Sequence, residues 1–270
     1  MNSKPVIIAL LLFCLLSCKL DKTIEVVLPP YEPKTMVECY LEPGKPYTIF
    51  LTKSISYFDS LYPNVNRAQI TINYKGKVDT LKYNPFLDST SSKFYLYTAA
   101  KIVPNEFDIP YTLNIVEEDG QVITGETSLL APVKIDTILY TYSDKSSGNV
   151  SLQVRFQDNH QTDDYYRLLV NRNTLLVDAK NSDDLYNDVN LQSTNLELKV
   201  EERFDKNDTL IVTLAHISKA FYDFSKSVHL AAKANGNPFV QPAAIKSNVT
   251  GNALGIFAGY TYSRDTIIIK

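Results

Sequence analysis

Short runs of alternating apolar and polar residues dominate the first half of the chain. Ile70, Ile72 and Tyr74 occupy every second position, with polar residues between them. A period of two puts alternate side chains on opposite faces of a strand, so the pattern predicts strands with one buried and one wet face. Seven such runs are Met36 to Leu41, Tyr47 to Lys53, Ala68 to Tyr74, Val78 to Tyr83, Phe94 to Ala99, Tyr111 to Glu117 and Val122 to Thr127.

A second series of strand-like runs follows the break at Leu130-Ala131-Pro132. We therefore place a domain boundary near residue 131. The expected fold is all-β, with two consecutive immunoglobulin-like or transthyretin-like β-sandwich domains over residues 35–131 and 132–270. The runs of the second series are Ile135 to Tyr142, Val150 to Asp158, Tyr165 to Asn171, Thr174 to Asp178, Leu196 to Val200, Thr209 to His216, Leu254 to Tyr262 and Thr266 to Ile269.

One segment of the second half follows a different period. Between Ile217 and Lys233 the apolar residues recur at helical spacing, and Ser218 is a suitable N-cap. We expect one inserted helix near 217–233, with Phe221, Phe224, Val228 and Ala231 facing the core rather than a ligand.

The N-terminus carries a pattern of another kind. Lys4 is followed by eleven apolar residues, Val6 to Leu16. A helix of that length rises about 16 Å, roughly half of a bilayer's hydrocarbon core, so residues 1–17 are expected to be a cleaved signal peptide and not a span.

The residues around the cleavage site specify the signal further. Leu15-Leu16-Ser17-Cys18 matches a lipobox, in which a small residue precedes a cysteine whose thiol takes a diacylglycerol. Cys18 is therefore the predicted lipidation site, and two or three acyl chains anchor a protein stably. An ordinary secretory signal with an incidental cysteine is the alternative.

Residues 18–34 are expected to form a proline-containing tether between the lipid and the first domain. Beyond the signal, no second apolar run approaches 18 residues, which leaves the lipid as the expected anchor. Of the three cysteines, Cys14 leaves with the signal and Cys18 is lipidated, so only Cys39 remains and no intrachain disulfide is expected.

The charge balance limits the partners. Twenty-seven basic and 30 acidic side chains give a net charge of −3, with no long run of either sign. Binding to nucleic acid needs a basic footprint that this composition lacks, so we expect no nucleic-acid partner. The predicted partner is a membrane, through the lipid anchor.

Motifs of catalysis are missing from the sequence. It has no GxSxG, HExxH, CxxC or phosphate-binding glycine loop, and its histidines, His160, His216 and His229, share no ligand spacing. The acidic stretches 158–164 and 205–208 offer oxygen ligands for Ca²⁺ but lack the calcium-loop pattern, so turns are the favoured interpretation. We expect a non-enzymatic protein with no cofactor and no metal.

A tripeptide pattern exceeds its expected frequency. Asp followed by Ser or Thr and then an aliphatic residue or Thr occurs six times, where composition alone gives about one. This resembles the O-glycosylation acceptor pattern of exported Bacteroidota proteins. The alternative is that Asp-Thr simply opens strands. The candidate acceptors are Ser60, Thr80, Ser89, Thr137, Thr209 and Thr266.

The segment from Gly236 to Tyr260 combines a turn, a polar stretch and glycines at every fourth position. A loop that crosses one end of the sandwich and closes it with a last hairpin is the structural interpretation. A partner-binding surface is the functional one. Its candidate residues are Asn237, Pro238, Phe239, Asn248, Gly255 and Phe257.

Two stretches, Leu28 to Asp59 and Gly236 to Tyr260, resemble the Bacteroidota lipoproteins grouped as domain of unknown function 4249. The resemblance implies an outer-membrane or surface lipoprotein, often encoded beside TonB-dependent receptors, with no catalytic residue established. Two departures are Cys39, where a small residue such as glycine is expected, and Asn252-Ala253 in place of a glycine pair.

We therefore expect a lipid-anchored accessory or binding protein of the outer membrane that serves a TonB-dependent receptor in nutrient uptake. The alternative is a structural or adhesive surface spacer. A binder needs a concave site with aromatic residues and a few polar groups, whereas a spacer needs none. Only one acid lies among the four residues after Cys18, which leaves the periplasmic face and the cell surface both open.

Substitution Cys18→Ser tests the anchor. A hydroxyl is a far weaker nucleophile than a thiolate near neutral pH, so the variant should incorporate no labelled palmitate and leave the membrane fraction. Each lost methylene removes about 0.8 kcal/mol of membrane affinity. Labelling and fractionation beside the parent protein check this, and equal palmitate incorporation would contradict the lipobox assignment.

Overall fold

The computed structural model describes residues 31–56, 63–89, 92–144, 148–176, 180–189, 191, 193–234 and 243–270. These residues form three β-sheets and one helix, which confirms the all-β class with one inserted helix. No helix among them has the length and apolarity needed to cross a membrane.

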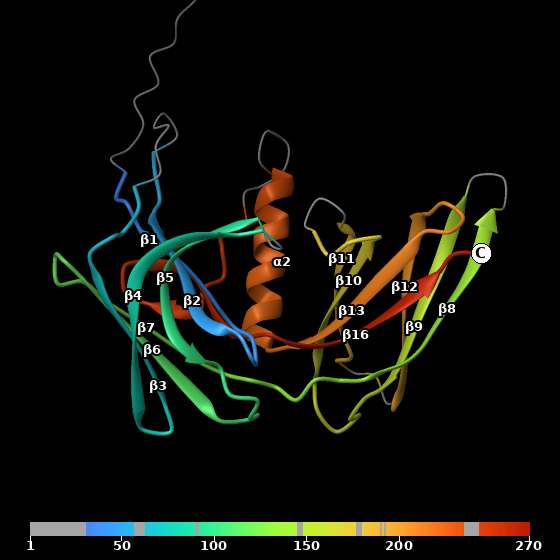
Figure 1. Ribbon diagram of the computed structural model, residues 1–270, viewed down its shortest axis with the longest axis horizontal. Helices are drawn as coiled ribbons and strands as arrows, with labels where there is room; N and C mark the ends of the chain where they lie inside the picture. Colours follow the sequence, from blue (N-terminus) through green and yellow to red (C-terminus); the bar gives the residue numbers. More distant parts are fainter. Residues whose placement is uncertain are drawn as a thin grey trace, which may run out of the picture. The chain divides into compact units, whose positions relative to one another are not determined.

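The largest sheet has nine strands in the order β14-β7-β6-β3-β4-β5-β2-β1-β15 (Figure 1). All neighbouring pairs are antiparallel except β1 and β15, which run parallel. The strands are β1 (Thr35–Leu41), β2 (Pro46–Lys53), β3 (Ala68–Tyr74), β4 (Lys77–Asp88), β5 (Lys93–Ile102), β6 (Pro110–Glu117), β7 (Val122–Ser128), β14 (Val249–Thr250) and β15 (Ala253–Gly259).

This sheet curls into a near-barrel around its own core. Odd-numbered residues of β1 point inward, as the period of two predicts, and pack with every second residue of β2, β3 and β6. The edge strand β15 approaches β7, the strand next to the other edge, where the Gly259 N–H donates to Thr127 Oγ1 at 3.2 Å. Cys39 is a free, fully buried thiol whose pKa is raised by that burial.

Two smaller sheets face each other across a second core. Their orders are β11-β10-β13-β16 and β12-β9-β8, and side chains from both sheets make up one buried cluster. This part is therefore a β-sandwich of seven strands. The strands are β8 (Ile135–Asp144), β9 (Asn149–Gln157), β10 (Tyr165–Arg172), β11 (Lys180–Asn187), β12 (Asn195–Arg203), β13 (Thr209–Ile217) and β16 (Thr261–Ile268).

The chain does not complete one sheet system before it starts the next. After β13 it forms the helix, adds β14 and β15 to the nine-stranded sheet, and then returns to the sandwich as β16. The expected strand Leu254 to Tyr262 is therefore wrong, because it divides at Tyr260 between two sheets. The expected arrangement, in which 35–131 and 132–270 form two consecutive domains, is corrected for the same reason. Strands β14 and β15 come from the second range but belong to the nine-stranded sheet.

The helix α2 (Lys219–Ala234) lies close to its predicted position. Ser218 is its N-cap, since Ser218 Oγ accepts the Phe221 N–H at 3.3 Å. Phe221 and Phe224 are buried as expected, whereas Val228 is 37% exposed. The buried residues of the helix end at Ser227, which is why the predicted apolar stripe is buried over half of its length.

The strand expected from Thr174 to Asp178 lies in the wrong place. Residues 174–176 form no strand, and the strand that pairs with β10 is β11, which starts at Lys180. Most of β11 is polar because it lies at the edge of its sheet, so it lacks the apolar alternation that marks the other strands.

Gly255 allows β15 to lie against β1. Its φ of +145° is unfavourable for any residue with a side chain, and an added Cβ would lie 1.8 Å from the carbonyl oxygen of Val37. Val37 is its direct partner in the parallel ladder. A side chain at position 255 would therefore separate the two strands.

Substitution Gly255→Ala should lower the free energy of unfolding by about 3 kcal/mol or more, from backbone strain plus overlap with β1. The matched control is Gly44→Ala. Gly44 also has positive φ, at +81°, but an added Cβ would meet no atom within 4 Å, so only about 1 kcal/mol of strain is expected. Urea unfolding followed by circular dichroism measures both, and equal losses would contradict the close-approach argument.

Candidate functional site

Several sequence-predicted features fall on residues that the structure does not describe. They are the signal peptide 1–17, Cys18, the tether up to residue 30, Ser60, Asn237, Pro238 and Phe239. The O-glycosylation candidates Thr80, Ser89, Thr137 and Thr266 are exposed, and Thr209 is partly exposed. Their hydroxyls are thus open to modification, which stays a prediction.

The described residues of the predicted partner surface hold β15 in place. The Asn248 side chain accepts the Phe257 N–H at 2.8 Å and donates to the Phe257 carbonyl at 2.7 Å, so its amide acts as an extra strand residue beside β15. Phe257 is fully buried and offers no surface to a partner. Gly255, the third described residue of that surface, borders a cavity.

That cavity is the candidate ligand site. It has a volume of about 390 Å³, within the range of small-molecule pockets, and it lies on the outer side of β1 and β2. The lining residues are Met36, Val37, Glu38, Phe50, Thr52, Lys53, Ser54, Ile55, Phe224 and Gly255.

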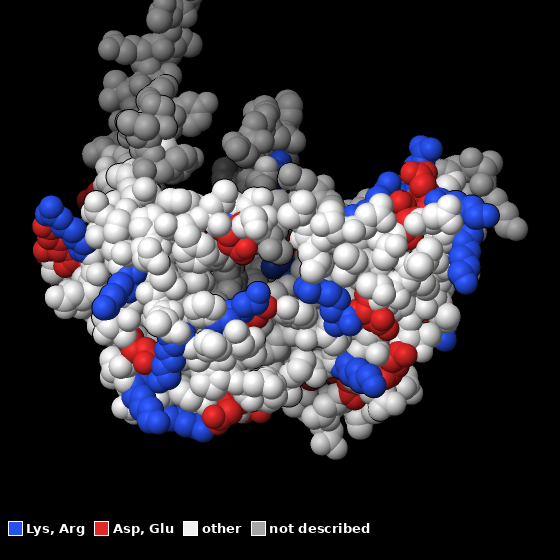
Figure 2. Space-filling model, viewed as in Figure 1, with Lys and Arg blue, Asp and Glu red and all other residues white. Residues whose placement is uncertain are grey.

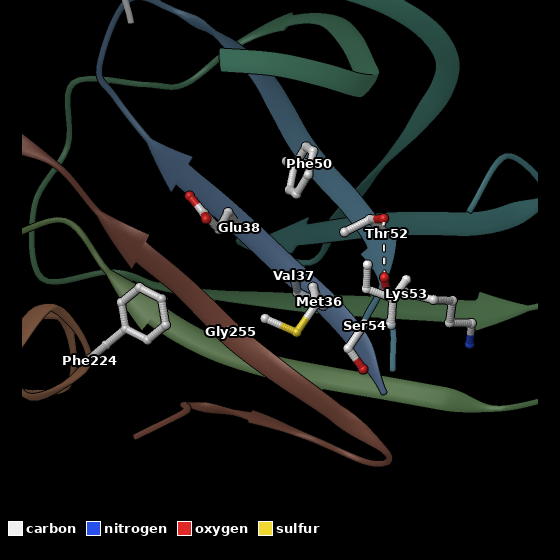
Figure 3. Close-up of a pocket in the computed structure, with 10 residues that line it drawn as sticks. Met36, Val37, Glu38, Phe50, Thr52, Lys53, Ser54, Phe224 and Gly255 are labelled. Atoms are coloured by element: carbon white, nitrogen blue, oxygen red, sulfur yellow. Dashed lines mark hydrogen bonds between the residues drawn. The ribbon is translucent and has the colours of Figure 1, made fainter. Parts of the chain in front are cut away.

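Strand alternation explains which side chains reach the pocket. Residues of β1 at odd positions fill the barrel core, so Met36 and Glu38 face outward, as Phe50 does on β2. Phe224 comes from α2 and lies on the opposite side of Gly255 from Phe50 in Figure 3. Apolar groups of β1, β2 and α2 thereby converge on one site.

An ion pair fixes the polar side of the pocket. Glu38 pairs with Lys93 of β5, and the Tyr40 hydroxyl lies 3.4 Å from the same carboxylate. The Lys93 ammonium lies 4.7 Å from the centroid of the Tyr40 ring. Burial, followed by the nearby Glu38 charge, raises the pKa of Tyr40, so its hydroxyl remains a neutral hydrogen-bond donor.

Lys53 borders the pocket but directs its charge elsewhere. Figure 3 shows its amine turned away from Met36 and Phe50. The ammonium donates to Thr35 Oγ1 at 2.9 Å and pairs with Glu117, whose side chain is 5% exposed. Thr35 also donates to Glu117, so this buried polar group joins β1, β2 and β6 behind the pocket.

The helix that supplies Phe224 is held by aromatic contacts on both sides. The ring centroids of Phe221 and Tyr40 of β1 lie 5.2 Å apart, and those of Tyr222 and Tyr165 of β10 lie 5.1 Å apart. Arg167 of β10, which forms two bonds of 2.7 and 2.8 Å with Asp183, also lies over the Phe221 ring. Strands of two different sheets therefore position the pocket wall.

An acidic cluster lies at one end of the sandwich. Asp158, Asp164 and Asp188 each place a carboxylate oxygen within 4.8 Å of the others, which is an arrangement that could hold a metal ion. Burial, followed by hydrogen bonding with Asp158, raises the pKa of Asp188. The acidic stretch 158–164 is evident in the sequence, but Asp188 is not part of it, because 24 residues separate Asp164 from Asp188 and no spacing rule connects them.

Among the described residues, no other group of three acidic, histidine or cysteine side chains is close enough to hold a metal ion. Figure 2 shows basic and acidic side chains interspersed over the face that it displays, without a large patch of one sign. This agrees with the balanced composition.

A family model described as a domain of unknown function (DUF4249) matches residues 21–266. The chain belongs to the DUF4249 family. The match covers both sheet systems and the inserted helix, so the exchange of β14 and β15 lies within the unit that defines the family. A search of curated proteins gives no significant match to this DUF4249 chain.

Substitution Lys53→Met tests the polar group behind the pocket. It would leave the buried Glu117 carboxylate without its ammonium partner, and loss of one member of a buried pair costs about 3 kcal/mol or more. The control is Lys75→Met, which breaks the exposed pair with Glu106 and should cause no measurable change. Urea midpoints compare the two, and similar values would show that the Lys53 pair contributes no more than a surface pair.

Proposed function

We propose that this DUF4249 protein is a Bacteroidota lipoprotein of the outer membrane that acts as a non-enzymatic binding or accessory protein. Its partner in this proposal is a TonB-dependent receptor engaged in nutrient uptake, and its contact site is the pocket beside β1, β2 and α2. The lipid anchor on Cys18 and the receptor partnership rest on the lipobox and the family resemblance described above.

The pocket is the observation that carries the proposal. A spacer protein needs no concave site, whereas this chain combines Met36, Phe50, Ile55 and Phe224 with the carboxylate of Glu38 in about 390 Å³. Apolar walls with a few fixed polar groups are typical of ligand sites. The arrangement thus favours a binder over a structural or adhesive spacer.

The position of the pocket along the chain supports a role near the membrane. Lys34 and Ser54, at the entrance of β1 and the exit of β2, exchange two hydrogen bonds next to the pocket. Between Cys18 and Thr35 the chain reaches at most about 60 Å when fully extended. A lipid on Cys18 would therefore keep the pocket within roughly that distance of the bilayer surface.

We further propose that the second half of the chain is an immunoglobulin-like sandwich. Its sheets contain three and four strands, and β8, β9 and β12 lie opposite β11, β10, β13 and β16. Two facing antiparallel sheets of this size are typical of that fold. The segment from α2 to β15 is then an insertion before the last strand. The first half has a single nine-stranded sheet that closes into a near-barrel, so the immunoglobulin-like or transthyretin-like sandwich expected there is not part of this proposal.

Substitution Phe50→Glu tests the pocket. A charge on the apolar wall should reduce recovery of the receptor at least tenfold when the tagged protein is captured from detergent-solubilised outer membranes. The loss of one buried aromatic contact corresponds to about 1.5 kcal/mol, which is slightly more than a tenfold change in affinity. Quantitative mass spectrometry of the captured TonB-dependent receptor gives the ratio.

The control is Phe94→Glu, an outward-facing aromatic residue of the same sheet that is 43% exposed and does not line the pocket. It should leave receptor recovery unchanged. If the parent protein recovers no receptor while other outer-membrane complexes stay intact, the partnership is wrong. If both variants recover the receptor as well as the parent does, the pocket is not the contact site.

A further inference from the structure

The helix α2 ends in a stretch that the rest of the fold does not bury. Its last buried residue is Ser227, and every residue from Val228 to Ala234 is exposed or partly exposed. Leu230 is 48% exposed. The apolar stripe that is buried at Phe221 and Phe224 therefore continues uncovered for about two turns. We call residues 228–234 the helix end.

The charge of this half of the helix has one sign. Beyond Asp223 the helix contains Lys226 and Lys233, both exposed, and no acidic residue. Asp223 itself is paired with Lys219 at 2.6 Å and with Lys246 at 3.7 Å. At about 100° per residue, Lys226 and Lys233 lie on one side of the helix, away from the apolar stripe. A helix with an apolar side and a basic side is typical of segments that lie in the interface of an anionic bilayer.

The contacts of α2 place the helix end beside the start of β1. Phe221 packs on Tyr40, near the end of β1, whereas Phe224 lines the pocket together with Met36, near its start. The helix therefore runs toward the start of β1, and the ten residues after Phe224 extend it by about 15 Å. Figure 1 shows the C-terminal end of α2 and the start of β1 on the same side of the structure, at the top of the view.

The chain between Cys18 and Thr35 connects this side of the structure to the predicted lipid. That stretch spans at most about 60 Å, so a lipid on Cys18 would keep the helix end close to a bilayer surface. A short tether gives a high effective concentration, and weak contacts from a few side chains then suffice for docking. The inference therefore rests on the lipid anchor of the proposed function.

We propose that the helix end docks on the surface of an anionic bilayer. Val228 and Leu230 enter the boundary between acyl chains and headgroups, while Lys226 and Lys233 contact anionic headgroups. Each lysine near such a surface raises the affinity about fivefold. Because Phe224 lies one turn before Val228, docking holds the pocket at the membrane surface, where a receptor embedded in the same membrane can reach it.

Tryptophan fluorescence tests the proposal on the full-length lipidated protein, because the chain has no Trp of its own. The protein is reconstituted into vesicles of phosphatidylethanolamine and phosphatidylglycerol, with or without bromine on the acyl chains. Bromine quenches tryptophan only on contact, so the emission of Leu230→Trp should fall at least twofold. The matched control is Val78→Trp, at an apolar position of β4 that is 61% exposed. The turn between β3 and β4 lies at the opposite side of Figure 1, so bromine should leave the control unchanged.

A second substitution tests whether the apolar stripe causes the docking. Val228→Glu, added to Leu230→Trp, should at least halve the quenching, because a carboxylate is repelled by anionic headgroups and resists entry into the acyl region. Val78→Glu on the same Leu230→Trp background adds the same charge at the far side and should leave the quenching unchanged. All three positions are exposed, so the variants should keep the circular dichroism spectrum of the parent.

Equal quenching of the two tryptophan positions, or undiminished quenching in Val228→Glu, would overturn the proposal. So would a Leu230→Trp emission that iodide in solution cannot quench and bromine does not change, because a protein and not a lipid would then cover the helix end. Absence of quenching in protein that floats with the vesicles refutes the docking alone, whereas protein that does not float refutes the lipid anchor as well. None of these measurements contains a receptor, so the receptor-capture result is independent of them.

Discussion

The parallel pairing of β15 with β1 is the constraint on which the rest of the structure depends. It joins residues 253–259 to residues 35–41, near opposite ends of the chain, and it nearly closes the nine-stranded sheet around its core. The pairing requires that nothing separates the two backbones at Val37 and Gly255. On its other side, β15 is held by the amide of Asn248 and by Thr127 of β7.

The pocket follows from this pairing. Because β15 lies beside β1, the chain that precedes it has to cross from the sandwich, and α2 fills part of that crossing with Phe221 and Phe224. The chain that follows returns at once as β16, paired with β13. The two sheet systems are thus connected by covalent chain in both directions. Apolar contacts between Tyr40, Phe221 and Tyr260 accompany that connection.

The local pattern of the sequence was sufficient wherever a residue's environment depends on its neighbours in the chain. Alternation with a period of two located most strands to within a few residues, because one face of each strand is buried and the other is wet. Ser218 marked the helix start for a similar reason, since a cap acts within its own first turn. Strand β11 escaped notice because an edge strand needs little apolar surface.

The candidate sites could not be predicted from local sequence patterns. The sequence singled out Gly255, but Met36, Phe50 and Phe224 meet only because β1, β2 and α2 pack together, and Asp188 joins Asp158 and Asp164 only through the folding of β10 and β11. The sequence by itself determined most of the strands, the helix, the candidate lipid anchor and the family. The tertiary structure decided that one apparent strand divides at Tyr260 and which side chains share a site, because contacts between distant segments depend on packing and not on spacing along the chain.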